Sequence, residues 1–141
     1  MTEPAWLADE YRRSGNLLRA DDRSYRFVIS AVLTCTRWFF EAVGGFDETF
    51  QQYGGEDWEW AHRAWAQGAL LAHEPLAVAW HDGPDWADRS PADARRAKNA
   101  ETLALADRIP VAGSRGRALT PTRPEHVVRL QGPLSPAAAF V

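Results

Sequence analysis

Hydrophobic and polar positions alternate in two different ways along the chain, which predicts both strands and helices. The segment 25–36 (YRFVISAVLTCT) is rich in β-branched and aromatic residues, a composition typical of a strand. The segment 56–67 repeats its apolar positions with a helical period instead. Four residues of this helix share one face, at i, i+3, i+4 and i+7: Trp58, Ala61, His62 and Trp65. We expect this face to be buried and Trp60 to point elsewhere.

Capping and breaking residues delimit the other elements. Ser90 suits the N-cap of a helix and Pro91 its first position, so a helix is predicted over 91–108. The remaining predicted elements are two short helices and two short strands, over 4–13, 37–43, 69–73 and 76–80. Together they indicate a small α/β domain with a short mixed sheet and packed helices.

The pattern also divides the chain into three parts. Residues 1–24 are polar and interrupted by Gly15, so they form an N-terminal extension. The predicted elements fill a folded domain over 25–109. Residues 110–141 are rich in Pro and Gly and have no sustained period, which predicts a disordered tail.

Composition narrows the class of protein. The chain has 141 residues and a formal net charge of −3, which argues against a nucleic-acid partner. Cys35 is the single cysteine, so an intrachain disulfide and a cysteine-based zinc site are excluded. The sequence predicts no transmembrane segment, because its apolar runs are far shorter than the roughly 20 residues that cross a bilayer. The N-terminus does not resemble a signal peptide, and we expect a cytoplasmic protein.

The chemistry of the chain is concentrated between residues 44 and 81. This stretch contains two Gly pairs, and glycines allow positive φ and close approach of the backbone to a ligand. Glu56 and Asp57 follow the second pair and open the Trp-rich helix. His81 ends the last predicted strand, where an imidazole can bind a metal or transfer protons.

The order of these motifs resembles a known family. A strand, a short helix, GGFDE, a loop, GGED, a helix, Gly, a strand and His follow one another over about 25–109. This order is similar to the C-terminal, acceptor-side half of inverting nucleotide-sugar glycosyltransferases with the GT-A fold, such as the bacterial family 2 enzymes and the β-1,4-galactosyltransferases. The resemblance implies a partial GT-A-like fold that lacks the N-terminal nucleotide-binding half and its DXD motif.

The resemblance also implies roles for individual residues. Asp57 matches the catalytic base, which takes a proton from the acceptor hydroxyl. Glu56 and the preceding Gly54-Gly55 match the loop that holds the acceptor. His81 matches a ligand of Mn²⁺ or Mg²⁺, which would be bound only with a complete donor site. The implied substrates are a nucleotide-sugar donor and a glycan or other hydroxyl acceptor.

Aromatic side chains near this loop suggest a further contact with sugar. Tyr53 and Trp60, with Trp80 and Trp86, would form a platform for the apolar face of a sugar ring. The incomplete sheet predicts association with other chains, either as a homo-oligomer or with a chain that binds the donor.

Other interpretations of the same residues remain open. Glu56 and Asp57 also suit the first turn of any helix, and His81 also suits a strand end bonded to backbone. The chain is then either the catalytic acceptor half of a hexosyltransferase or a non-catalytic remnant that binds a glycan or a protein. A small metal-dependent hydrolase is a third interpretation, and it would use four residues: His81, Asp82, Asp85 and Asp88.

Overall fold

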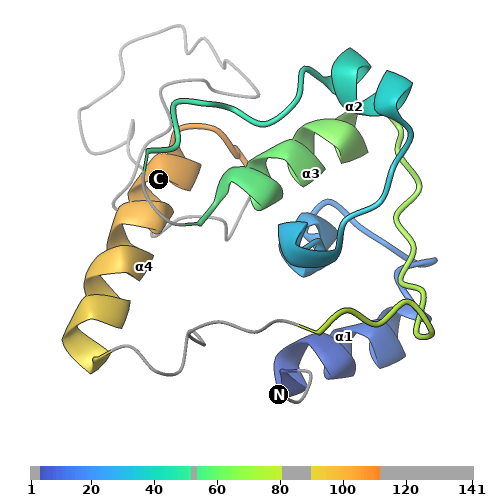
Figure 1. Cartoon of the computed structure of the whole chain (residues 1–141), viewed down its shortest axis with the longest axis horizontal. Helices are drawn as coiled ribbons and strands as arrows, with labels where there is room; N and C mark the ends of the chain where they lie inside the picture. The colour runs from blue at the N-terminus through green and yellow to red at the C-terminus, as the bar shows by residue number, and fades with distance from the viewer. Residues whose placement is uncertain (1–3, 52–53, 81–89, 112–141) are drawn as a thin grey trace, which may run out of the picture.

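The computed structural model describes residues 4–51, 54–80 and 90–111. These residues form four α-helices and two short 3-10 turns, and no strand is assigned among them. The elements in chain order are α1 (Ala5–Ser14), η1 (Ser24–Phe27), η2 (Ser30–Val32), α2 (Arg37–Val43), α3 (Glu56–Ala66) and α4 (Pro91–Ala106) (Figure 1). Helix α3 lies between α2 and the η turns, while α4 and α1 lie on the outside (Figure 1).

Capping residues explain the bounds of α2 and α4. The Thr36 hydroxyl accepts the Phe39 N–H at 3.2 Å, and Gly44 ends α2 in the left-handed region at φ 98°. The Ser90 hydroxyl accepts the Asp93 N–H at 3.1 Å at the start of α4. The sequence predictions of these helices and of α1 are confirmed, although α4 ends at Ala106 instead of 108.

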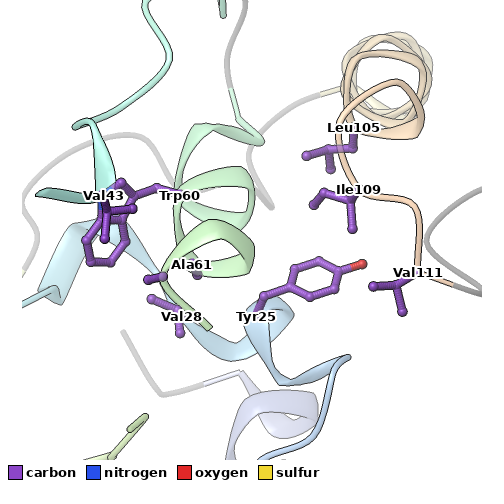
Figure 2. Close-up of a cluster of buried hydrophobic side chains, with 9 residues drawn as sticks. Tyr25, Val28, Val43, Trp60, Ala61, Leu105, Ile109 and Val111 are labelled. Carbon is purple, nitrogen blue, oxygen red and sulfur yellow. The ribbon is translucent and has the colours of Figure 1, made fainter. Parts of the chain in front are cut away.

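The hydrophobic core forms around the buried face of α3. Figure 2 shows Val43 beside Trp60 on one side of the helix and Tyr25 on another, with its ring toward Ile109 and Val111. The core comprises nine residues: Tyr25, Val28, Val43, Trp60, Ala61, Ala64, Leu105, Ile109 and Val111. The segment that leaves α4 therefore joins the same core as α2, α3 and η1.

The buried face of α3 differs by one position from the predicted one. Trp60 is only 3% exposed, so the prediction that it points away from the core is wrong. Three rings from α2 and the following loop surround the indole, with centroids 5.6–6.3 Å away: Phe39, Phe40 and Phe46. Trp58 and Trp65 are only partly buried.

The strand predicted over 25–36 is not formed. Its backbone makes local bonds instead, from the Val28 N–H to the Tyr25 carbonyl and from the Val32 N–H to the Ile29 carbonyl, both 3.2 Å long. Strand preference depends on packing against a paired neighbour, and the described residues provide no such strand. For the same reason the segments 69–73 and 76–80, which the structure describes, do not form the predicted strands. The GT-A-like α/β class as a whole stays a prediction.

Two further predictions concern the ends and the membrane. Residues 112–141, most of the predicted tail, lie outside the described residues. None of the helices formed by the described residues has the length and hydropathy needed to cross a membrane.

Candidate acceptor site

The glycine pair before α3 is required by backbone conformation and by packing. Gly54 and Gly55 have φ values of 94° and 99°, a region that residues with a Cβ rarely adopt. A Cβ on Gly55 would lie 2.9 Å from Cε1 of Phe50, and one on Gly54 would lie 3.3 Å from Oε2 of Glu101. In this structure the close approach that we predicted for a ligand is thus made by protein side chains.

Asp57 is held by two backbone amides from different parts of the chain. Its Oδ1 accepts the Trp58 N–H at 2.8 Å, and its Oδ2 accepts the Ser30 N–H at 3.1 Å. Gly55 is the N-cap of α3 and has no side chain to accept an amide, so Asp57 satisfies one of the unpaired N–H groups of the first turn. The partly buried carboxylate therefore caps the helix and is fixed in direction at the same time.

Helix α4 packs beside the glycine pair Gly54 and Gly55. Lys98 Nζ lies 4.4 Å from the centroid of the Trp58 ring and 2.6 Å from Oε1 of Glu101. The Glu101 side chain is only 9% exposed and lies against Gly54. Glu101 was not among the residues predicted from the sequence, although its i, i+3 spacing from Lys98 on a helix was a signal for this ion pair.

The GGFDE motif has a structural role in which Arg63 is central. The Arg63 guanidinium donates two bonds to Glu59, at 2.6 and 2.7 Å, and Glu59 is buried. It also donates to the carbonyl oxygens of Val43 and Gly45. Arg63 therefore connects α3 to the end of α2 and to the first glycine pair.

Asp47 of the same motif connects the loop to the end of α4. Its Oδ1 accepts the hydroxyl and the N–H of Thr49, and its Oδ2 accepts Arg108 Nε at 2.9 Å. The Thr49 hydroxyl, followed by Arg108, holds the pKa of the Asp47 carboxyl well below its usual range. This carboxylate stabilises the fold around the site.

The predicted site residues are only partly brought together. Glu56 opens α3 beside Asp57, next to Gly54 and Gly55, as predicted from the motif. Tyr53 and His81 lie outside the described residues, and the buried Trp60 is not available as a surface platform. Among the residues that the structure describes, no group of three or more His, Cys, Asp or Glu side chains could hold a metal ion.

An open groove lies elsewhere on the molecule, between α1 and residues 73–75. It has a volume of about 450 Å³ and is lined by seven residues: Ala8, Tyr11, Arg12, Gly15, Asn16, His73 and Pro75. The rings of Tyr11 and His73 stack there, with centroids 3.7 Å apart. Sequence reasoning assigned no function to these residues.

Comparison with known proteins shows which family model and which relatives the sequence of this chain matches. Residues 18–75 match the family model described as the N-terminal domain of galactosyltransferase. The match includes η1, η2, α2, α3 and Asp57, and it ends before His81 and α4. The chain is related to glycosyltransferases.

Individual relatives agree with this relationship. The chain is 25% identical over 125 residues to the chondroitin synthase of Pasteurella multocida, a match that covers 89% of this chain and 12% of the relative. It is 29% identical over 106 residues to the chondroitin synthase of Escherichia coli, covering 74% of this chain and 15% of the relative. It is 41% identical over 56 residues to the pre-mycofactocin glycosyltransferase of Mycobacterium tuberculosis, covering 40% of this chain and 12% of the relative.

The extent of these matches limits what they carry over. The chain spans only 12% to 15% of the length of these relatives. The matching family model is described as an N-terminal domain, so the predicted correspondence with an acceptor-side, C-terminal half stays a prediction. The division of the chain at residues 24 and 109 also stays a prediction.

Proposed function

We propose that this chain is the acceptor side of an inverting, GT-A-like glycosyltransferase that transfers a sugar from a nucleotide-sugar donor to a hydroxyl group of a glycan. The observation that carries this proposal is the Asp57 carboxylate, which begins α3 in the GGED motif and is fixed by the amides of Trp58 and Ser30. The relationship to glycosyltransferases over 18–75, a range that contains Asp57, supports it.

Asp57 acts as the general base in this proposal. The acceptor oxygen forms its bond to the anomeric carbon while the bond from that carbon to the nucleoside diphosphate breaks. The hydroxyl proton goes to the Asp57 carboxylate, and the diphosphate leaves with the bonding electrons. A carboxylate with a fixed direction suits this role, because proton transfer requires hydrogen-bond distance and alignment.

Residues around Asp57 would bind the acceptor. Gly54 and Gly55 directly precede α3, Glu56 is the first residue of this helix, and Tyr53 remains a proposed sugar contact. Trp58 replaces Trp60 as the aromatic group of the site, since it is partly exposed and lies beside Asp57. The Lys98 ammonium covers the Trp58 ring at 4.4 Å from its centroid and is paired with Glu101.

A divalent cation belongs to this proposal only in combination with a donor-binding half. His81 would be the ligand from this chain, and Mn²⁺ suits an imidazole better than Mg²⁺ does. The described residues do not fit a metal centre by themselves, so no step is assigned to the ion. Exposed apolar side chains at Leu70, Leu76 and Trp80 are consistent with a further chain or domain that provides the donor site.

A second candidate function is a non-catalytic module that binds a glycan or a protein. The contacts of α4 with the glycine pair favour it, since Glu101 and Leu105 occupy the space beside Gly54 and Gly55. A remnant of this kind would bind glycan without transferring sugar.

Substitution of the proposed base separates the two functions. Asp57→Asn keeps an oxygen acceptor for one amide but cannot take a proton at neutral pH. We expect transfer from a UDP-sugar to a chondroitin oligosaccharide to fall about 10²–10⁴-fold, measured with the full chain and a separately expressed donor-binding domain. The far-UV circular dichroism spectrum should be unchanged.

The control and the contrary outcome are specific. Asp22→Asn makes the same chemical change at an exposed position and should leave transfer unaltered. Full transfer by the Asp57→Asn variant would exclude Asp57 as the base. Oligosaccharide binding without transfer by the wild-type chain would favour the non-catalytic module.

A further inference from the structure

The hydrogen bond between Ser30 and Asp57 joins segments that are 27 residues apart in sequence. Ser30 is the first residue of η2, so its amide is not needed for the local bond of that turn, which runs from the Val32 N–H to the Ile29 carbonyl. Ser30 lies within the strand that was predicted over 25–36, and no function was predicted for it.

The core fixes the chain just before this amide, although Ser30 itself is exposed. Tyr25 of η1 is 2% exposed and Val28, two residues before Ser30, is 9% exposed. Both pack in the cluster that contains Ala61 and Ala64 of α3. The segment 25–28 and the helix that carries Asp57 are therefore held against each other by the same buried contacts, and Ser30 follows this segment by two residues.

We infer that the backbone N–H of Ser30 positions the Asp57 carboxylate for proton transfer, an inference that rests on the proposed function. Each carboxylate oxygen has two lone pairs. The Trp58 amide uses one on Oδ1 and the Ser30 amide uses one on Oδ2, so each oxygen keeps an acceptor site for a hydroxyl proton. Without Ser30, the amide of the adjacent Trp58 would be the one hydrogen-bond donor to this carboxylate among the residues that the structure describes.

A proline substitution removes this amide without opposing the local backbone. Ile29 has φ −116° and ψ 124°, which is the conformation that a residue before proline prefers. The first position of a helical turn also accepts the fixed φ of proline. Ser30→Ala is the matched control, because it changes the side chain and keeps the N–H.

The first measurement needs no activity. Three-bond couplings between Hα and Hβ of Asp57, measured by NMR on the full chain, report its χ1 rotamer. We expect one rotamer in the wild type and in Ser30→Ala, and averaged couplings in Ser30→Pro. Unchanged couplings in Ser30→Pro would overturn the inference.

The second measurement is sugar transfer by the chain with the donor-binding domain. We expect kcat of Ser30→Pro to fall about tenfold, the value of one lost hydrogen bond, with KM for a chondroitin oligosaccharide unchanged and with Ser30→Ala like wild type. Averaged couplings with an unchanged kcat would also overturn the positioning role. A wild-type chain without transfer would overturn the proposed function instead, while the couplings still decide whether the Ser30 amide fixes Asp57.

Discussion

Arg63 donates hydrogen bonds to three residues, Glu59, Val43 and Gly45, and its environment makes those bonds costly to lose. Its side chain is 29% exposed, and that of its partner Glu59 is 8% exposed. Removal of the guanidinium would leave a buried carboxylate and the carbonyls of Val43 and Gly45 without a donor. Such losses cost more than the loss of an ion pair in water.

Arg63→Ala is therefore expected to lower the free energy of unfolding by about 3 kcal/mol, as measured by urea denaturation. Arg12 forms an ion pair with Asp9 in which both side chains are largely exposed, at 75% and 69%. Arg12→Ala is the control and should change stability by less than about 1 kcal/mol. Equal effects of the two substitutions would contradict the role assigned to Arg63.

Asp47 makes the stability of the loop depend on pH. Its pKa is lowered from the ordinary value of 3.8 by the Thr49 hydroxyl and by Arg108. A lowered pKa in the folded state stabilises the protein above the unfolded value, and this stabilisation is lost as pH falls from about 3.8 toward the folded value. The difference in unfolding free energy between wild type and Asp47→Asn should thus shrink between pH 5 and pH 3. A difference that is constant with pH would contradict this account.

At the scale of elements, the sequence predicted a helix correctly where the capping residues of that helix lie next to it in the chain. Thr36 caps the start of α2 and Gly44 its end, and Ser90 caps the start of α4, as their capping chemistry predicts. The prediction of a strand over 25–36 was wrong. β-branched and aromatic residues favour a strand when they can pack against neighbouring strands, and no such strand is formed by the described residues.

The face of α3 and part of the site could not be predicted for a related reason. Two adjacent stripes on this helix share the i, i+3, i+4, i+7 spacing, one through Trp58 and one through Asp57 and Trp60. The rings that pack on Trp60 decide between them, and these come from elsewhere in the chain. Asp57 and its glycines are apparent from their motif, whereas Ser30 and Glu101 reach the site only through tertiary packing.

The start of α3 also permits a test of the glycine pair. Gly55→Ala places a residue with a Cβ at a strained φ of 99°, and this Cβ would lie 2.9 Å from Cε1 of Phe50. Gly68→Ala is the matched control, because Gly68 has φ 89° but no atom within 4 Å of the added Cβ. We expect about 1 kcal/mol of destabilisation for Gly68→Ala and at least about 2 kcal/mol for Gly55→Ala in urea denaturation. Equal losses of unfolding free energy in the two variants would show that the contact of the added Cβ with Phe50 does not destabilise the fold.

At the scale of the whole molecule, η1 and α2–α4 form one core, and the candidate site lies where α3 begins, beside α4. Apolar side chains are exposed after α3, at Leu70, Leu76, Val78 and Trp80. In the proposed function, other residues would cover these side chains and provide the donor site. Association with a second chain stays a prediction.

The central claim is that the start of α3 binds the acceptor, and NMR on the full chain tests it most directly. The chain labelled with ¹⁵N would be titrated with a chondroitin oligosaccharide, and amide shifts would be followed along the sequence. The account predicts saturable shifts at Gly54–Trp58, at Ser30 and at Lys98–Glu101. Shifts confined to the groove between Tyr11 and His73, or no saturable shifts at the start of α3, would contradict it.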